Sequence, residues 1–274
     1  MKNMKRKNKT NKYGLVVLTA VLAAVEPVSM VYANMQEPAI ENVVQNHGFC
    51  LRSVSDTDSQ DLDSNDTQGL KLTMKTYQHE YKLENGKVYK NIAFEYPYAE
   101  GESEAAQTFN KFYQSLYKKW KKATKANLAD AKSIVAERED DICYGDEVSC
   151  EIMSSDDNYI SILQTGYDYQ MGAHGMPYRY SYIFDAKTGK KISPAKVLGI
   201  TKEELNAKVQ KLYIKKLKKN PSAFYVTQEE MTDALKNIDF NNMCYIKNGK
   251  MRFYVDPYAI APYAAGFVET AVKL

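Results

Sequence analysis

The stretch GYDYQMGAHGMPYRYSYIFDAKTGKK, from Gly166 to Lys191, decides how this chain is interpreted. The tyrosine-rich sequence on either side of GAHG is typical of β-strands, because aromatic side chains fit a half-buried pleated surface. Gly172 and Gly175 allow positive φ angles, which a tight turn needs. We therefore predict two neighbouring strands joined by a turn, with His174 in that turn.

His174 is one of only three histidines in the 274 residues. A catalytic histidine needs a partner that orients it and a group on which it acts, and the sequence around this one provides neither visibly. We therefore expect a structural role, in which the imidazole hydrogen-bonds the turn to the sheet through Asp168 or Asp185.

Further elements follow on both sides of this stretch. Asn85-Gly86 and Asn248-Gly249 each separate two strand-like runs, which is a strong signal for a hairpin. Between the first hairpin and the central strands the apolar residues switch to helical spacing, with a break expected near Asn127. The residues on the apolar face of this helix are Phe109, Phe112, Leu116 and Trp120.

Two shorter helices are indicated by Thr201 and Thr227, each followed three residues later by a glutamate that completes a capping box. Strands, helix, strands, helices and strands in this order predict an α+β fold. We expect antiparallel sheets with Asn-Gly hairpins, packed by one long and two shorter helices.

The N-terminus has the features of an export signal. A basic segment precedes the apolar run GLVVLTAVLAAV, and small residues then allow cleavage after Ala33. We predict a signal peptide over residues 1–33, with an uncleaved membrane anchor as the alternative, and a disordered acidic and serine-rich linker over residues 34–69. Without the signal, 31 basic and 33 acidic residues remain, so the overall charge gives no reason to expect nucleic-acid binding.

Four cysteines follow the predicted signal, and an even number in an exported chain suggests two disulfides. We favour a bridge between Cys143 and Cys150 across a hairpin that turns at Asp146-Glu147. Cys50 and Cys244 are then left as the second pair. A zinc site is disfavoured by the irregular spacing of the cysteines.

Motifs for enzymatic chemistry are absent from the sequence: there is no GxSxG, no phosphate-binding loop and no HExxH. Carboxylate pairs of the kind that glycosidases use are present at Asp140-Asp141, Asp156-Asp157 and Glu203-Glu204, but such pairs are common on solvated surfaces. Two lysine-rich segments, 118–125 and 208–219, are interpreted as solvated helix faces, with contact to anionic wall polymers or lipid head groups as the alternative.

The segments Tyr159–Gly199 and Met251–Leu274, with the series GAHG, FDAKTGK and APYAAG, resemble the extracytoplasmic domain of the RsiV-type family of lysozyme-sensing anti-sigma factors. Residues Asn91–Trp120 resemble the N-terminal module of PdaC-type peptidoglycan deacetylases. The resemblance implies a PdaC-like module over residues 70–139 and an RsiV-type module over residues 140–274, with one shared core as an open possibility. In the RsiV-type family GAHG usually follows another glycine, where this chain has Met171.

These observations together predict a secreted or cell-envelope binding protein without catalytic residues, metal or cofactor. The resemblance implies lysozyme as a ligand, and another envelope protein or a wall polymer is an alternative partner. An acidic stretch in the linker, Asp56–Asp66, would attract a basic partner. An enzyme acting on wall glycan through a carboxylate pair and His174, or an envelope module that docks through a sheet edge, remain competing hypotheses. The residues expected to bind the ligand are Tyr169, His174, Tyr178 and Tyr263.

Overall fold

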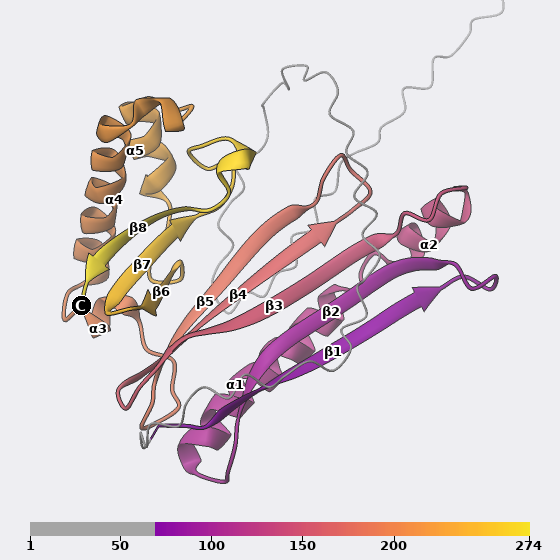
Figure 1. The fold of residues 1–274 in the computed structure, drawn as a ribbon, viewed down its shortest axis with the longest axis horizontal. Coiled ribbons are helices and arrows are strands. Elements are labelled where there is room, and N and C mark those ends of the chain that lie inside the picture. Colours follow the sequence, from indigo (N-terminus) through magenta and orange to yellow (C-terminus); the bar gives the residue numbers. More distant parts are fainter. Residues whose placement is uncertain (1–68) are drawn as a thin grey trace, which may run out of the picture.

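The computed structural model describes residues 69–274. The predicted signal peptide, the predicted linker up to residue 68 and Cys50 lie outside the described residues. The described part contains eight strands and five α-helices in two sheets, and it is an α+β fold, as predicted (Figure 1).

The strands are β1 (Leu72–Lys82), β2 (Val88–Ala99), β3 (Tyr144–Ser155), β4 (Tyr159–Tyr169), β5 (Met176–Asp185), β6 (Cys244–Lys247), β7 (Lys250–Val255) and β8 (Val268–Lys273). The helices are α1 (Glu104–Ala123), α2 (Leu128–Ala136), α3 (Pro194–Val197), α4 (Lys202–Lys219) and α5 (Gln228–Lys236), and two 3₁₀ turns are η1 (Pro221–Ala223) and η2 (Tyr263–Ala265).

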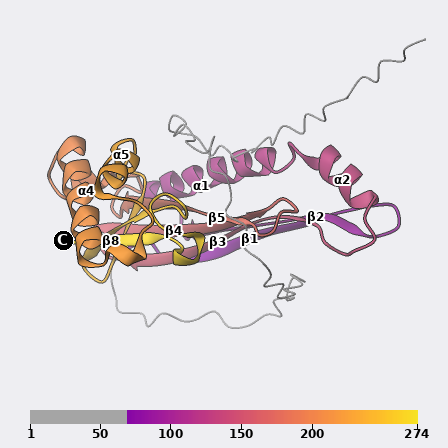
Figure 2. The same ribbon diagram turned by 90° about the horizontal axis from the view of Figure 1, so that it is seen from above.

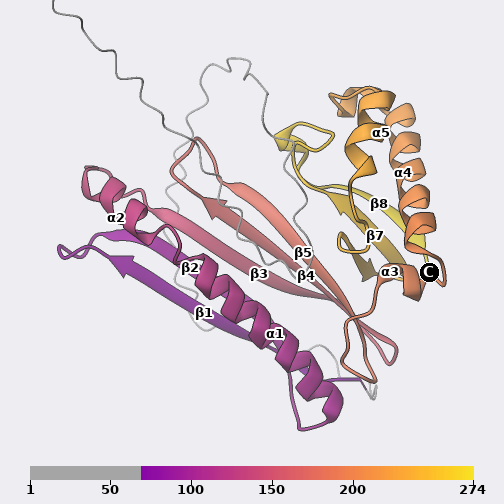
Figure 3. The same cartoon turned by 180° about the vertical axis from the view of Figure 1, so that it is seen from behind.

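The first five strands form one sheet in the order β1-β2-β3-β4-β5. All neighbours are antiparallel except β2 and β3, which are parallel, so the sheet is mostly antiparallel, as predicted, with one parallel pair that the sequence did not indicate. Parallel neighbours need a crossover connection, and α1 with α2 provides it. Figure 2 shows α1 lying along one face of the sheet, and Figure 3 shows it from behind, running roughly along β2.

The core between α1 and this sheet is aromatic. The predicted apolar face of the long helix is the buried face of α1, with Phe109 and Trp120 fully buried. Phe184 of β5 contacts Phe109 edge to face, with ring centroids 4.7 Å apart. Strands from both predicted modules share this core, because β3, β4 and β5 belong to the same sheet as β1 and β2.

The second sheet has the order β6-β7-β8 and packs against α4 and α5. The hairpin between β6 and β7 turns at Asn248-Gly249, with φ angles of 53° and 65°, the left-handed pair that a tight two-residue hairpin requires. Both predicted capping boxes are present, at Thr201 before α4 and at Thr227 before α5. The break expected near Asn127 is the start of α2.

Two buried serines join the sheets. Ser161 of β4 accepts a hydrogen bond from the backbone N–H of Ile246 (2.8 Å), and Ser181 of β5 accepts one from the N–H of Cys244 (2.9 Å). Both donors belong to β6, whose other side pairs with β7. Serine side chains of the first sheet therefore accept hydrogen bonds from the backbone N–H groups at the edge of the second sheet.

The predicted disulfide between Cys143 and Cys150 is wrong. The expected turn at Asp146-Glu147 lies inside the continuous strand β3, so the chain extends where it was expected to reverse. Seven residues of extended chain separate the two Cα atoms by about 20 Å, and a disulfide needs less than about 7 Å. Cys143, Cys150 and Cys244 are free thiols. Cys50, the predicted partner of Cys244, lies outside the described residues.

The loop at Gly189 gives a test of the packing between α1 and β5. Gly189 has a φ of 65°, and a Cβ there would lie 2.0 Å from the backbone oxygen of Ala105 at the start of α1. Gly199 has nearly the same φ, 66°, but a Cβ there would meet nothing within 4 Å. We expect Gly199→Ala to lower the free energy of unfolding by about 1–2 kcal/mol through backbone strain alone. Gly189→Ala should lose about 1–3 kcal/mol more, because backbone atoms must move.

Chemical denaturation of the two variants measures this difference. Equal losses would show that α1 is not held against the loop at Gly189.

Candidate functional site

His174 lies in the turn between β4 and β5 and packs against two tyrosines from near the C-terminus. Its ring stacks on Tyr263 of η2, with centroids 4.1 Å apart and planes at 28°. The ring of Tyr258, from the loop after β7, is 6.4 Å from His174 and 5.5 Å from Tyr263. We call these three residues the His174 cluster. His174 is exposed and the two tyrosines are half-buried, so the cluster is accessible to a ligand.

Hydrogen bonds fix the orientation of the rings. The Nδ1 atom of His174 lies 2.9 Å from the carbonyl oxygen of Gly175, which also accepts from the hydroxyl of Tyr263 at 3.0 Å. A carbonyl only accepts, so Nδ1 carries a hydrogen. In the neutral ring Nε2 is then an acceptor, and the hydroxyl of Tyr258 lies 3.3 Å from it. Nδ1 is thus used within the turn of His174, and Nε2 joins this turn to the loop that holds Tyr258.

The loops that form the cluster hold two residues in the left-handed region. Met171 has a φ of 65° and Tyr258 a φ of 66°, and Asn248 in the β6–β7 turn is the third such non-glycine residue in residues 69–274. A non-glycine side chain there costs about 1–2 kcal/mol and persists only where the surroundings hold it. Met171 is held by packing near α2, against a cluster that includes Val135.

The positive φ expected at Gly172 and Gly175 is therefore found at Met171 instead. Gly175 is needed for a different reason, which is space. A Cβ at this position would lie 2.5 Å from the ring of Tyr167 and 2.8 Å from the backbone oxygen of Asp168. The turn lies close against β4, and only a glycine allows this approach.

The four predicted ligand-binding residues do not all meet. His174 and Tyr263 are in direct contact, as described. Tyr169 lies at the end of β4 opposite Gly145 of β3, and Tyr178 points under α1. Tyr258 and Tyr225 were not among the residues predicted from the sequence. The hydroxyl of Tyr225 donates a hydrogen bond to the backbone oxygen of Tyr258.

The expected hydrogen bond from His174 to Asp168 or Asp185 is wrong. Asp168 accepts from the side chain of Gln170 (2.6 Å). Asp185 accepts from the backbone N–H and the hydroxyl of Thr188 and so holds the turn after β5. The stacking on Tyr263 draws His174 towards the second sheet and away from both carboxylates.

A second polar group lies buried beneath the C-terminal end of α1. Asp146 of β3 is 5% exposed, and it accepts hydrogen bonds from the hydroxyl of Tyr178 (2.9 Å) and from the indole of Trp120 (3.4 Å). Lys90 is 8% exposed and donates to a carbonyl at the end of α1 (2.7 Å). Burial, with a smaller contribution from nearby Asp168, raises the pKa of Asp146 to about 6, and burial lowers the pKa of Lys90.

Asp146→Asn tests this buried charge, because it keeps an oxygen that can accept from Tyr178. The folded state holds the Asp146 proton more tightly than the unfolded state, whose pKa is near 3.8. The resulting stabilisation is full below pH 3.8 and is lost as the pH rises through about 6. Between pH 4 and pH 7.5 the variant should therefore gain about 2–3 kcal/mol in free energy of unfolding relative to the parent.

Denaturation curves across this pH range measure the gain. Asp185→Asn is the control: the hydrogen bond from Thr188 lowers the pKa of Asp185 below 3.8, so this group titrates mostly below the measured range and the difference between this variant and the parent should stay nearly constant. A difference between the Asp146 variant and the parent that does not change with pH would contradict the buried charge.

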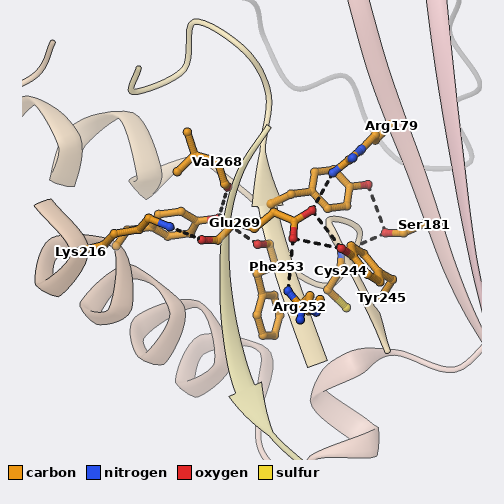
Figure 4. A network of polar contacts seen from close by, with 11 residues as sticks. Arg179, Ser181, Lys216, Cys244, Tyr245, Arg252, Phe253, Val268 and Glu269 are labelled. Atoms are coloured by element: carbon orange, nitrogen blue, oxygen red, sulfur yellow. Dashed lines mark hydrogen bonds and ion pairs between the residues drawn. The ribbon is translucent and has the colours of Figure 1, made fainter. Parts of the chain in front are cut away.

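Glu269 of β8 is the centre of a network that connects the two sheets (Figure 4). Its carboxylate pairs with Arg179 of β5 (2.8 Å) and accepts from the hydroxyl of Tyr245 of β6 (3.0 Å). Arg252 lies 3.7 Å from the second oxygen, and the amine of Lys216 donates to the backbone oxygen of Glu269 (2.9 Å). The network joins β5, which follows the His174 turn, to β8, which follows η2.

A double-mutant cycle on Arg179 and Glu269 tests this connection. Both side chains are about three-quarters or more buried, at 20% and 26% exposure, so solvent screens the pair only in part. We expect Arg179→Met and Glu269→Gln to couple by about 1–2 kcal/mol in the free energy of unfolding. The exposed pair of Arg138 and Asp140 is the control and should couple much more weakly, because solvent screens it. Similar coupling in both pairs would contradict a special role for Glu269.

The adjacent carboxylates noted in the sequence lie at local turns and helix starts. Asp140 pairs with Arg138, Asp156 accepts from the backbone N–H groups of the β3–β4 turn, and Glu204 completes the capping box of α4. Within residues 69–274 there is no group of three His, Cys, Asp or Glu side chains that could hold a metal ion. In the same residues no helix has the length and apolar character to cross a membrane.

Two family models match the chain. Residues 83–177 match the model described as deacetylase PdaC, and residues 198–274 match a protein of unknown function, DUF3298. The two matched segments are therefore similar to a PdaC-type domain and to a DUF3298-type domain, in this order along the chain. No curated protein matches the chain.

A solved structure of the DUF3298 family shares the fold. A member from Bacteroides fragilis superposes with a TM-score of 0.51 at 16% identity, over 76% of this chain and 92% of that protein. A member from Pseudomonas aeruginosa gives a TM-score of 0.46 at 18% identity, over 74% of this chain and 90% of that protein. At these identities the first likeness supports the fold alone.

Proposed function

We propose that this chain is a secreted or cell-envelope binding protein without catalytic activity, and that the His174 cluster contacts its ligand. The observation that carries the proposal is the cluster itself: three aromatic rings, stacked and accessible, supplied by two loops that each hold a strained residue. Aromatic side chains offer large, rigid contact area at little cost in conformational entropy.

The contacts of His174 favour binding over chemistry. A general base is usually oriented by a carboxylate or a carbonyl through one nitrogen and keeps the other free for its substrate. Here Nδ1 contacts the carbonyl of Gly175 and Nε2 contacts the hydroxyl of Tyr258. An imidazole with both nitrogens in contact with protein groups helps to fix the conformation of a binding surface.

The first ligand to test is a lysozyme, because the chain resembles RsiV-type lysozyme-sensing domains in the two segments that form the cluster. The GAHG series supplies His174, and the APYAAG series supplies Tyr263. The contact between these two segments supports testing the His174 cluster first. The structural neighbours add the fold to this argument and nothing about a ligand.

Calorimetric titration of lysozyme into the purified fragment Asn34–Leu274, with muramidase activity measured in parallel, tests the proposal. We expect submicromolar binding and loss of muramidase activity. His174→Ala should weaken binding by at least about tenfold, since it removes the ring on which Tyr263 stacks. His79→Ala is the matched control, because His79 is an exposed histidine of β1 that contacts Tyr81 rather than the cluster.

Each outcome leads to a different conclusion. Binding that both variants retain would move the contact away from His174. No heat and no inhibition would remove lysozyme as the ligand, and muropeptides and intact wall glycan would be titrated next. Release of new reducing ends from wall glycan by the fragment alone would favour the glycan-hydrolysing enzyme.

A docking module is the second candidate, and β1 is the observation that favours it. This 11-residue strand pairs only with β2 in the described part of the chain, so its outer backbone edge is available to a partner strand. Binding lost in edge variants of β1 but kept in His174→Ala would support this alternative.

A further inference from the structure

The outward face of α4 carries a continuous stripe of lysines. The helix buries Leu205, Val209, Tyr213 and Leu217 against the second sheet, at the spacing of one helix face. The stripe lies on the other side, where all of its side chains are exposed. Its members, which we call the α4 stripe, are Lys208, Lys211, Lys215, Lys218 and Lys219.

The stripe is electrostatically unfavourable for the isolated helix. Like charges three or four residues apart on a helix destabilise it by about 0.2–0.5 kcal/mol per pair, and each stripe lysine has such a neighbour within the stripe. Lysines in the last turn compensate part of this cost, because they interact favourably with the helix C-terminus. Lys208, Lys211 and Lys215 lie before that turn and have no such compensation.

Carboxylates on the described surface do not neutralise the stripe. No ion pair within residues 69–274 includes a stripe lysine. The acids of α4, Glu203 and Glu204, are confined to its first turn. On the neighbouring helix α5, Glu230 bonds the backbone N–H of Thr227. The positive charge of the stripe is therefore available to an external anion.

We infer that the α4 stripe is a docking surface for a linear phosphodiester polymer of the poly(glycerol phosphate) type. Successive turns of the helix present a lysine about every 4.5–6 Å along its axis, which suits a flexible chain with one charge in each short repeat. The ammonium group of lysine is a good phosphate partner and demands no fixed geometry, so it fits a mobile polymer.

A membrane surface is a poorer match for the same lysines. A helix that lies in a bilayer interface places large apolar side chains beside its basic residues. The exposed large apolar side chains of the described residues are Met74, Ile134, Ile142, Met176, Tyr225 and Leu274, and none is on α4. Exposed aromatic rings that could stack on nucleic-acid bases are also missing from this face of the helix.

The experiment compares two triple variants that remove the same charge. Lys208→Gln/Lys211→Gln/Lys215→Gln changes the stripe, and Lys111→Gln/Lys118→Gln/Lys122→Gln changes the exposed lysines of α1. Binding of delipidated poly(glycerol phosphate) to the purified protein is measured over a range of salt concentrations. The α4 variant should lose at least about tenfold in affinity, and the slope of log K against log salt should become less steep by about 2. The α1 control should stay within about twofold of the parent.

Several results would overturn the inference. These are no binding by the parent, equal losses in both triple variants, or tighter binding to poly-glutamate or to phosphatidylglycerol vesicles than to the phosphate polymer. If the triple variant fails to fold by circular dichroism, Lys215→Gln alone decides: about a threefold loss of affinity supports the stripe, and parental affinity contradicts it. Lysozyme binding is measured on the same variants and should be unchanged.

Discussion

The hydrogen bonds from β6 to Ser161 and Ser181 are the constraint on which the arrangement of the two sheets depends. The N–H groups of Cys244 and Ile246 lie on the edge of a short strand and are buried by the first sheet. A buried backbone donor without a partner costs about 1–3 kcal/mol, so β6 can approach the first sheet only where such acceptors exist. Ser161 and Ser181, at 0% and 4% exposure in an otherwise apolar core, supply these acceptors.

This contact determines where the C-terminal loop lies. Once β6 is fixed on β4 and β5, β7 and β8 follow by antiparallel pairing, and the loop between them extends towards the β4–β5 turn (Figure 1). The ion pair of Arg179 with Glu269 holds the same region from the other side of that loop. The contact between His174 and Tyr263 is thus a consequence of tertiary packing, and the strain at Tyr258 is held by rings on both sides.

Much of the fold could be predicted from the sequence because its signals are local. Asn248-Gly249 adopts left-handed angles whatever surrounds it, Thr201 needs only Glu204 to cap its helix, and Phe109 and Trp120 share a helix face by spacing alone. Errors arose where distant segments decide the outcome. Cys143 directly precedes β3 and Cys150 lies within it. The chain stays extended between them because β3 pairs with β2 and β4, and the parallel pairing with β2 depends on the crossover through α1 and α2.

At the candidate site, too, the local features could be predicted from the sequence and the long-range contacts could not. The prediction of His174 in a turn is confirmed, because glycines mark turns, but the tyrosines that contact its ring lie more than 80 positions away. Tyr258 has no sequence signal of its own, since its importance lies in a φ angle of 66° and in the ring beside it. One of the two carboxylates that seemed natural partners, Asp185, is already committed to a local turn.

The notable polar and aromatic groups fall into two sets, one buried in the interior and one exposed on the surface. Asp146 and Lys90 are buried under α1, where hydrogen bonds and packing hold them, and a buried carboxylate with Tyr178 and Trp120 upon it has no route to a large ligand. The exposed features are aromatic rings at the His174 cluster and lysines on α4. Figure 1 places α4 on the side of the second sheet away from the β4–β5 turn, so a polymer held on α4 would leave the His174 cluster accessible. The fold thus places the two proposed contact surfaces on different faces, so both could be occupied at the same time.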